Sequence, residues 1–290
     1  NLLGGIVSAD EADGGEDTIT LGTGTNTVVG GTAGDTITAG QGVNVVLGDS
    51  GALAYSPEGW LQEAKTTTTA DGDTDDVDLA VDTGGNWNLV LGGQGGDAIT
   101  TGDGTNTVLG DHGTVTFQAA NLLGGIVSAD EADGGEDTIT LGTGTNTVVG
   151  GTAGDTITAG QGVNVVLGDS GSLAYGPEGW LQEAKTTAPA VGGVDDIDVG
   201  VGTADNWNLV LGGQGGDMID AGDGTSIVLG DNGQIRYAEG MLARIETTSP
   251  DIGGPDIITT GIGYDIILGG LNDDTITANC GETSASPDAS

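Results

Sequence analysis

Positive charge is scarce in this chain of 290 residues. The only basic residues, which oppose 44 carboxylates, are Lys65, Lys185, Arg236 and Arg244. The formal net charge of −40 argues against nucleic acid as a partner, because the phosphate backbone is itself anionic. So many carboxylates also repel one another in a compact fold unless cations bind them.

Aromatic residues, cysteine and long apolar runs are scarce as well. Aromatics make up 3% of the chain, too little material for one thick globular core. A single cysteine, Cys280, excludes an intrachain disulfide. No apolar run approaches the roughly 18 residues that a membrane span needs, so we expect no membrane-spanning segment. Yet hydrophobic residues reach 36%, too many for a disordered acidic tail. Short β-branched strands separated by glycines fit both observations.

Internal repeats predict the architecture. Residues 1–51 recur unchanged as 121–171, and similarity through 240 gives a period of 120. A shorter unit of about 60 residues lies within it, and we expect the stretch to begin inside a unit of a longer chain. The predicted units are 1–58, 59–120, 121–178, 179–240 and an incomplete fifth unit with a polar tail, 241–290.

A third period, of nine residues, runs through each unit. It spaces Asp17, Asn26, Asp35 and Asn44, and an aliphatic residue stands two positions after each. Each nonapeptide predicts a glycine turn followed by a short strand with alternating side chains. Two such strands complete one turn of a coil, so residues 18 apart stack. Aspartates then line one edge of the coil and asparagines the other.

A second element follows Gly-Asp-x-Gly in each of the first four units. It consists of two extended segments joined by a turn, such as Leu53/Tyr55 and Trp60-Leu61, and we expect a β-hairpin. We expect the hairpin to interrupt the coil and to cover the apolar face that carries Val29, Val45 and Leu47. The predicted fold class is all-β: a tandem parallel β-roll or β-solenoid with a β-hairpin insertion in each unit.

Three blocks resemble the RTX (repeats-in-toxin) nonapeptide, Gly-Gly-x-Gly-x-Asp-x-aliphatic-x. They are residues 30–38 (GGTAGDTIT), 92–100 (GGQGGDAIT) and 269–277 (GGLNDDTIT). The resemblance implies a secreted bacterial protein whose parallel β-roll holds Ca²⁺ between stacked turns. Corner carbonyls and the motif aspartates would be the ligands, which suits a cation that takes six to eight oxygens.

The chain departs from this motif on one edge, where asparagine or serine replaces the acid. Asparagines stacked there are expected to bond one another and the corner backbone. Calcium is therefore expected mainly along the aspartate edge, in rows that the hairpins interrupt. The predicted metal ligands are Asp17, Asp35, Asp49, Asp97, Asp111, Asp137, Asp155, Asp169, Asp217, Asp231, Asp256, Asp265 and Asp274.

Four of these ligands belong to Gly-Asp-x-Gly and are expected to share an ion with a motif aspartate. The predicted pairs are Asp35/Asp49, Asp97/Asp111, Asp155/Asp169 and Asp217/Asp231. The alternative is that the second aspartate of each pair only caps a turn. The segment Asp71-x-Asp73-x-Asp75 resembles the start of an EF-hand loop without its glycine, and a solvated acidic loop is favoured there.

Catalysis has no support in the sequence. His112 is the only histidine, and Ser50, Ser170 and Asn232 stand at its counterparts. We therefore expect a secreted, extracellular or cell-surface structural rod, such as an adhesin stalk or filament component, that folds on binding Ca²⁺. Its partners would be calcium ions and neighbouring repeats or copies of itself. Two alternatives remain: a Ca²⁺-binding secretion module of a larger enzyme or toxin, and an ice-binding face of Thr-x-Thr pairs.

Overall fold

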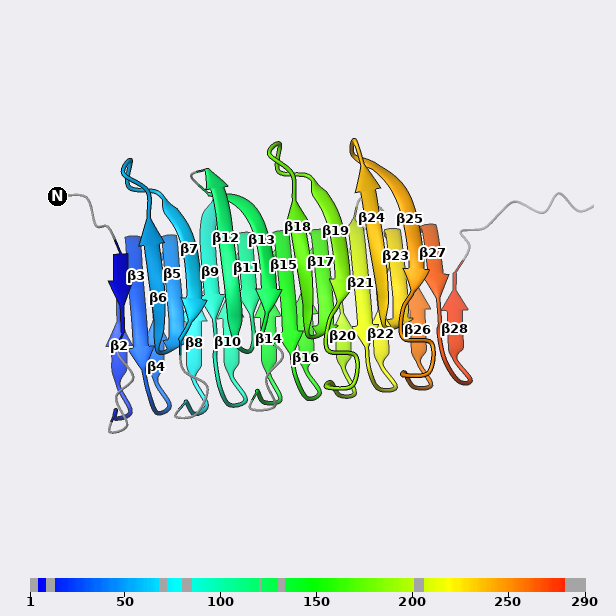
Figure 1. Ribbon diagram of the computed structural model, residues 1–290, viewed down its shortest axis with the longest axis horizontal. Coiled ribbons are helices and arrows are strands. Elements are labelled where there is room, and N and C mark those ends of the chain that lie inside the picture. Colours follow the sequence, from blue (N-terminus) through cyan, green and yellow to red (C-terminus); the bar gives the residue numbers. More distant parts are fainter. Residues whose placement is uncertain are drawn as a thin grey trace, which may run out of the picture.

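The computed structural model describes residues 5–8, 14–67, 72–79, 85–119, 121–129, 134–200 and 206–279. These residues form strands and turns, and none of them is helical. Consequently the described part contains no helix long and apolar enough to cross a membrane. Successive strands advance along one long axis from the N-terminal to the C-terminal side (Figure 1). The all-β prediction is confirmed.

One face of the coil is a parallel sheet of ten short strands, called here the short-strand sheet. Its strands, in spatial order, are β2 (Thr18–Thr20), β4 (Thr36–Thr38), β8 (Asp76–Leu79), β10 (Ala98–Thr101), β14 (Thr138–Leu141), β16 (Thr156–Ala159), β20 (Asp196–Asp198), β22 (Met218–Asp220), β26 (Ile257–Thr260) and β28 (Thr275–Ala278). On its outer side, Asp76 stands in register beside Thr36, so acids interrupt the threonine rows as the sequence indicates.

The opposite face is a parallel sheet of nine longer strands, called here the middle sheet. Its strands are β3 (Gly24–Gly31), β5 (Gly42–Asp49), β9 (Asn86–Leu91), β11 (Gly104–Leu109), β15 (Gly144–Gly151), β17 (Gly162–Asp169), β21 (Trp207–Gly213), β23 (Gly224–Asp231) and β27 (Gly263–Leu268). Thr18 pairs with Thr36 and Asn26 with Asn44, which confirms the predicted stacking of residues 18 apart.

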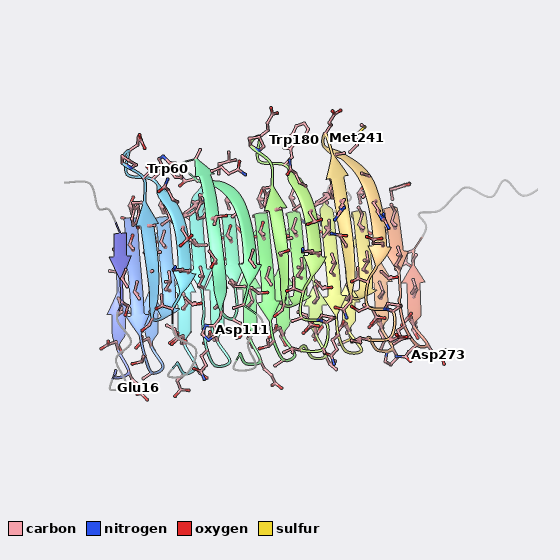
Figure 2. The ribbon with its side chains drawn as sticks, in the orientation of Figure 1. Glu16, Trp60, Asp111, Trp180, Met241 and Asp273 are labelled. Atoms are coloured by element: carbon pink, nitrogen blue, oxygen red, sulfur yellow. The ribbon has the colours of Figure 1, made fainter. Side chains whose placement is uncertain are left out.

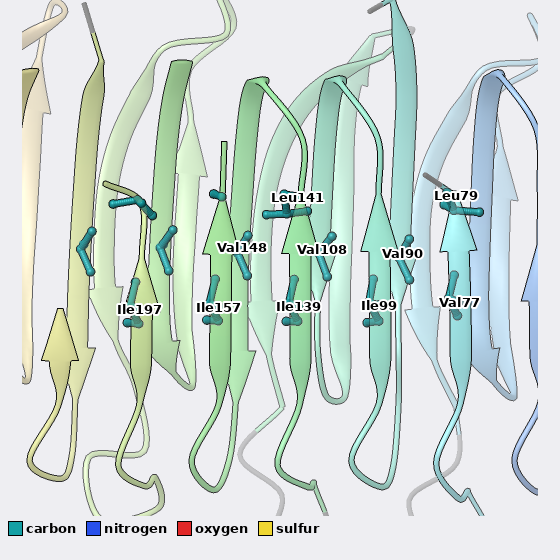
Figure 3. Packing of buried hydrophobic residues seen from close by; sticks show 14 of the residues in the cluster. Val77, Leu79, Val90, Ile99, Val108, Ile139, Leu141, Val148, Ile157 and Ile197 are labelled. Carbon is teal, nitrogen blue, oxygen red and sulfur yellow. The ribbon is translucent and has the colours of Figure 1, made fainter. Parts of the chain in front are cut away.

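A thin aliphatic core lies between the short-strand and middle sheets. Isoleucines such as Ile99 and Ile139 point inward from one sheet, and valines such as Val90 and Val108 point inward from the other (Figure 3). These four side chains are fully buried. The alternation predicted from the nine-residue period is therefore the packing of the coil. Its tightest corners need glycine: at Gly42, where φ is 140°, a Cβ would lie 1.9 Å from the Gly24 carbonyl oxygen.

A third, antiparallel sheet of nine strands, called here the hairpin sheet, contains the predicted hairpins. Its strands are β1 (Gly5–Val7), β6 (Gly51–Tyr55), β7 (Leu61–Thr66), β12 (Gly113–Ala119), β13 (Leu122–Ser128), β18 (Gly171–Tyr175), β19 (Leu181–Thr186), β24 (Gly233–Ala238) and β25 (Met241–Thr247). Each hairpin also pairs with the next, for example β7 with β12. The hairpins therefore form one continuous layer.

The hairpin sheet packs on the outer side of the middle sheet. Val45 and Leu47 of β5 are buried in the same cluster as Leu53 of β6 and Ala64 of β7, and Val29 packs against that cluster. The prediction that the hairpins cover this apolar face is confirmed. The molecule thus has three layers and two cores, which explains how so few aromatic residues are enough to fill it.

One expectation about the hairpins is wrong: they do not interrupt the coil. The short-strand and middle sheets run through every unit, and β5 pairs directly with β9 across the residues that form the first hairpin. The chain leaves the coil after Asp49, builds β6 and β7, and re-enters the coil before β8. Each hairpin is therefore an outgrowth from one corner, and the stacking of coils beneath it is uninterrupted.

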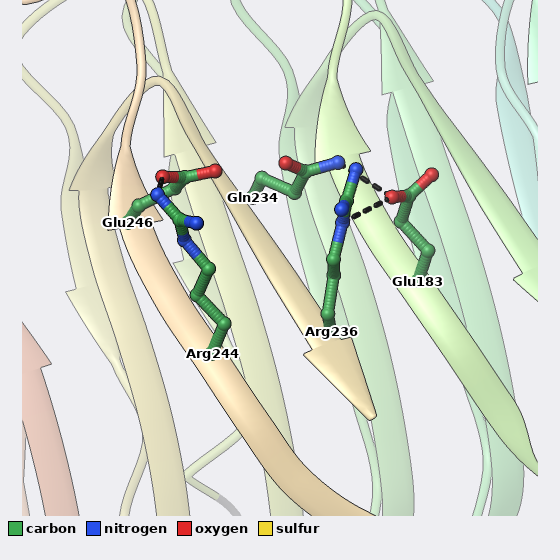
Figure 4. A network of polar contacts seen from close by, with 5 residues as sticks. All are labelled: Glu183, Gln234, Arg236, Arg244 and Glu246. Carbon is green, nitrogen blue, oxygen red and sulfur yellow. Dashed lines mark hydrogen bonds and ion pairs between the residues drawn. The ribbon is translucent and has the colours of Figure 1, made fainter. Parts of the chain in front are cut away.

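All four basic residues of the chain lie on hairpin-sheet strands. Arg236 of β24 donates to Glu183 of β19 at 2.8 Å, and Arg244 of β25 pairs with Glu246 (Figure 4). Lys65 stands 3.7 Å from Glu63 on β7. The ion pairs formed by these three cations are thus with glutamates of their own sheet, so they leave the aspartate edge without compensation.

Candidate metal centre along the aspartate edge

A continuous ladder of aspartates follows the corner at which each middle-sheet strand ends and the next short strand begins. The backbone N–H of each aspartate donates to Oδ1 of the next one, at 2.7–3.0 Å. The members of this aspartate ladder, in order, are Asp17, Asp35, Asp75, Asp97, Asp137, Asp155, Asp195, Asp217, Asp256 and Asp274. Each of these hydrogen bonds therefore uses one carboxylate oxygen to join one coil to the next coil.

The second carboxylate oxygen of the ladder has no donor. Oδ2 is buried without a hydrogen-bond partner in the eight inner members: Asp35, Asp75, Asp97, Asp137, Asp155, Asp195, Asp217 and Asp256. A buried carboxylate oxygen that accepts no hydrogen bond is costly. Either a proton or a cation is needed at each of these oxygens.

Each orphaned oxygen faces the glycine that closes a middle-sheet strand. A Cβ placed on Gly150 would lie 2.2 Å from Asp155 Oδ2 and 2.2 Å from the Gly168 carbonyl oxygen. The same arrangement recurs at Gly30 with Asp35 and at Gly92 with Asp97. Because glycine has no side chain, a carboxylate oxygen and a backbone carbonyl oxygen can both approach it closely, and this corner is called here a cradle.

Burial raises the pKa of the inner ladder carboxyls. It brings the pKa of Asp75 to about 8 and that of Asp217 to about 9, with a further increase from neighbouring aspartates and a decrease from the backbone N–H each accepts. Burial is also the main cause at Asp97, whose pKa rises to about 10. The edge therefore holds protons near neutral pH when no other cation is bound.

Four further aspartates stand where the chain leaves the coil for each hairpin. Asp111 Oδ1 accepts the Gly135 N–H at 3.1 Å, and its Oδ2 accepts the Thr152 hydroxyl at 2.7 Å. Asp169 and Asp231 likewise accept backbone N–H groups from the returning chain and from the next corner. These carboxylates fasten both ends of a hairpin to the coil through donors 23 to 45 residues away in the chain, which is not the local turn cap given as the alternative.

Of the four predicted carboxylate pairs, only Asp35/Asp49 is among the repulsions that raise the pKa values of these groups. Asp35 repels Asp49 and contributes to its raised pKa of about 7, of which burial is the main cause. The other exit aspartates act on ladder members of the following coils: Asp111 on Asp137 and Asp155, Asp169 on Asp217, and Asp231 on Asp256. Figure 2 places Asp111 at the corner opposite the hairpin tips.

Two ladder members are absent from the predicted ligands. Asp75 and Asp195 have the same Oδ1 bond and the same orphaned Oδ2 as their neighbours. Both stand directly before the first short-sheet strand of a unit, β8 and β20, as Asp17 and Asp137 do before β2 and β14, and this shared place is the signal that identifies them. Asp75 follows a single glycine, Gly72, whereas Asp195 follows Gly192-Gly193 much as Asp137 follows Gly134-Gly135. At the ends of the ladder, Asp17 is exposed and Asp274 is half-buried.

The opposite edge carries a second ladder, formed by asparagine. Side-chain Nδ2 of each asparagine donates to Oδ1 of the next at 2.8–2.9 Å, from Asn26 through Asn208. Several also donate to a corner carbonyl, as Asn106 does to Gly102 at 3.0 Å. The predicted asparagine stacking is confirmed. Its amides satisfy one another without a charge, and Asp265 stands beyond Ser226 at the C-terminal side of the row.

The donor chemistry of the aspartate edge fits a hard cation. Carboxylate and carbonyl oxygens are the ligands that Ca²⁺ takes, and each cradle offers one of each. Within the described residues, however, no three His, Cys, Asp or Glu side chains gather at one point. A cation here would be held by one or two carboxylates together with backbone oxygens. Asp71 and Cys280 lie outside the described residues.

Comparisons with known proteins identify no relative. No family model, no curated protein and no solved structure matches this chain. The interpretation of the aspartate edge therefore depends on its own geometry and on the nonapeptide resemblance.

Proposed function

We propose that this chain is a calcium-stabilised structural rod that works outside the cell, as part of a stalk, surface fibre or filament. The observation that carries the proposal is the row of eight buried Oδ2 atoms, each without a hydrogen-bond donor. Divalent cations along this row would satisfy the oxygens and offset part of the net charge of −40.

Metal binding and folding would be coupled in such a rod. With the carboxylates ionised and the cradles empty, the inner aspartates oppose folding because burial of an unpaired carboxylate is unfavourable. Calcium replaces the protons and supplies part of the folding free energy. Other extracellular Ca²⁺-binding modules bind the ion at roughly 10⁻⁴–10⁻³ M. The chain would remain unfolded in a low-calcium cytoplasm and fold after export.

A long, repetitive body without a unique cleft of acids suits a spacer. The carboxylates recur with every coil, so no single pair is set apart for chemistry. The three stacked layers continue from unit to unit, so adding a unit adds length and leaves the existing contacts unchanged. The exact repeat of 51 residues fits this role, because one copy can substitute for another.

Circular dichroism with and without a chelator tests the proposal. Added Ca²⁺ should produce or strengthen a β-sheet spectrum and raise the unfolding temperature, and excess EDTA should reverse both changes. Mg²⁺ at the same concentration controls for ionic strength and divalent charge, because Mg²⁺ releases its water less readily. A β-rich spectrum and an unfolding temperature that are identical in Ca²⁺ and in EDTA would show that calcium does not stabilise the fold.

A further inference from the structure

The chain gathers its scarce aromatic side chains around one hollow. Of nine aromatic residues, six line a hollow of about 520 Å³ between the middle sheet and the hairpin sheet. They are Trp87, Phe117, Tyr175, Trp180, Trp207 and Tyr237. The hollow lies beneath the tips of the hairpins, where Figure 2 places Trp180, on the opposite side from Asp111.

The floor of the hollow is one row across five neighbouring strands of the middle sheet. Trp87 pairs with Thr105, which is followed in register by Thr145, Val163 and Trp207. Two tryptophans thus stand four strand spacings apart, or about 19 Å at the usual spacing of β-strands. Thr105, Thr145 and Val163 are exposed between them. An elongated, open trough results, with a tryptophan at each end.

Hydroxyl groups accompany the aromatic rings. Tyr175 Oη bonds Thr147 Oγ1 at 3.3 Å, whereas Tyr237 Oη is buried and has no hydrogen-bond partner. Burial raises the pKa of Tyr237 to about 12, so its phenol remains a neutral donor. An orphaned phenol beside the ring of Trp207, 6.3 Å away between centroids, is a place where a ligand hydroxyl would be bound.

The side chains that line the hollow carry no charge, although the formal net charge of the chain is −40. None of the described residues that line the hollow is acidic or basic, and Glu178 and Glu239 line an adjoining hollow with Trp180 and Tyr237. An anionic ligand would be repelled by the surrounding field, and a plain alkyl chain would leave the threonine and tyrosine hydroxyls without partners. A ligand with apolar C–H faces and many hydroxyl groups satisfies both the rings and the hydroxyls.

We propose that this trough binds a short, neutral oligosaccharide. Sugar rings would lie on the faces of Trp180 and Trp207, and their hydroxyls would bond Tyr237 Oη and the threonine floor. The site is separate from the aspartate edge and does not depend on the calcium proposal. It gives a structural rod a means of holding a polysaccharide along its side.

Titration calorimetry on the full chain tests the proposal, in a buffer in which the protein has its β-sheet spectrum. The probes are cellotetraose and maltotetraose, which are neutral and differ in shape. Saturable binding of at least one is expected. Tyr237→Phe keeps the ring and removes the hydroxyl, and should weaken binding about threefold to tenfold. Trp180 is 56% exposed, so Trp180→Ala should leave the fold intact and weaken binding about tenfold or more.

The matched control is Trp60→Ala, which removes the equivalent tryptophan from the first hairpin and leaves the lining of the hollow untouched. Its affinity should equal that of the unchanged chain. Absence of binding by both sugars would overturn the proposal, as would sugar binding that neither Tyr237→Phe nor Trp180→Ala weakens. Tetramethylammonium and dodecyl maltoside are competing probes: Trp180-dependent binding of the cation, or of the detergent but not of maltotetraose, would assign the hollow to a different ligand class.

Discussion

At the scale of single residues, the glycines that close the middle-sheet strands matter for the space they leave. The cradle at Gly150 is bounded by the carboxylate oxygen of Asp155, at the start of the next coil, and by the Gly168 carbonyl oxygen of the neighbouring strand β17. A methyl group there cannot be accommodated by rotating a flexible side chain, because one of the atoms it meets is backbone. A glycine-to-alanine change is small, but at this position it is expected to disturb the packing.

Gly150→Ala is expected to destabilise the protein by about 1–3 kcal/mol, the range for forcing one extra methyl group into a packed site. Urea unfolding followed by circular dichroism measures the change. Gly22→Ala is the control, since a Cβ at Gly22 would meet no atom within 4 Å. Equal stabilities for the two variants would contradict the geometry of the cradle.

At the scale of structural elements, the two ladders are chemical opposites built on the same spacing. Asn88, Asn106 and Asn146 each donate and accept, so the asparagine ladder is satisfied without help. Asp97 accepts at Oδ1 and has nothing at Oδ2. Exchanging one residue between the ladders should therefore have opposite effects on the metal-free protein.

Asn106→Asp replaces two donated bonds, to Asn146 and to the Gly102 carbonyl, by contacts between acceptors. We expect a loss of about 1–3 kcal/mol for each bond. Asp97→Asn keeps the acceptor for the Asp75 N–H and turns a donor toward the cradle carbonyl. It should stabilise the protein in EDTA and reduce the stabilisation by Ca²⁺. Thermal unfolding in both conditions checks the pair, and destabilisation of both variants in EDTA would contradict the difference between the ladders.

Much of the coil can be predicted from the sequence. The inward aliphatic residue and the edge asparagine recur at a fixed spacing, as Ile37 follows Ile19 and Asn44 follows Asn26 by 18 residues, and this spacing is one turn of the coil. The continuous ladder and the joined hairpin layer cannot be predicted from it. The pairing of Lys65 with Thr114 between two hairpins connects residues that share no periodic pattern. Asp75 re-enters the coil after a return segment that has no nine-residue phase, so its place beside Asp35 depends on the tertiary structure. The hairpins interrupt the nine-residue period of the sequence, but they do not interrupt the stacking of the coil, because β5 pairs directly with β9.

At the scale of the whole molecule, the aspartate edge makes stability depend on pH. Burial raises the pKa to about 7 at Asp256, about 8 at Asp75 and about 10 at Asp97. A carboxyl with a raised folded-state pKa binds protons more tightly in the folded than in the unfolded chain. Between pH 4 and these values the folded state holds more protons, so raising the pH favours unfolding.

In EDTA, the unfolding temperature should therefore fall as the pH rises from about 4 to about 9, because each titrating carboxyl removes up to about 1.4 kcal/mol per pH unit. With saturating Ca²⁺ the decline should be much smaller, since the ion replaces the protons. Calorimetry across this range, with and without Ca²⁺, measures both curves. Stability in EDTA that rises with pH would contradict the burial of the ladder.

The three-layer construction also has a mechanical consequence. Neighbouring coils are joined by backbone hydrogen bonds in the short-strand and middle sheets, and between β1 and β25 the hairpin sheet adds a third set of joints (Figure 1). The borders between repeats are therefore no weaker than the rest of this part under tension along the axis, because separating two neighbouring coils anywhere in it breaks the hydrogen bonds of three sheets. A rod assembled from modular units would resist stretching as one continuous beam.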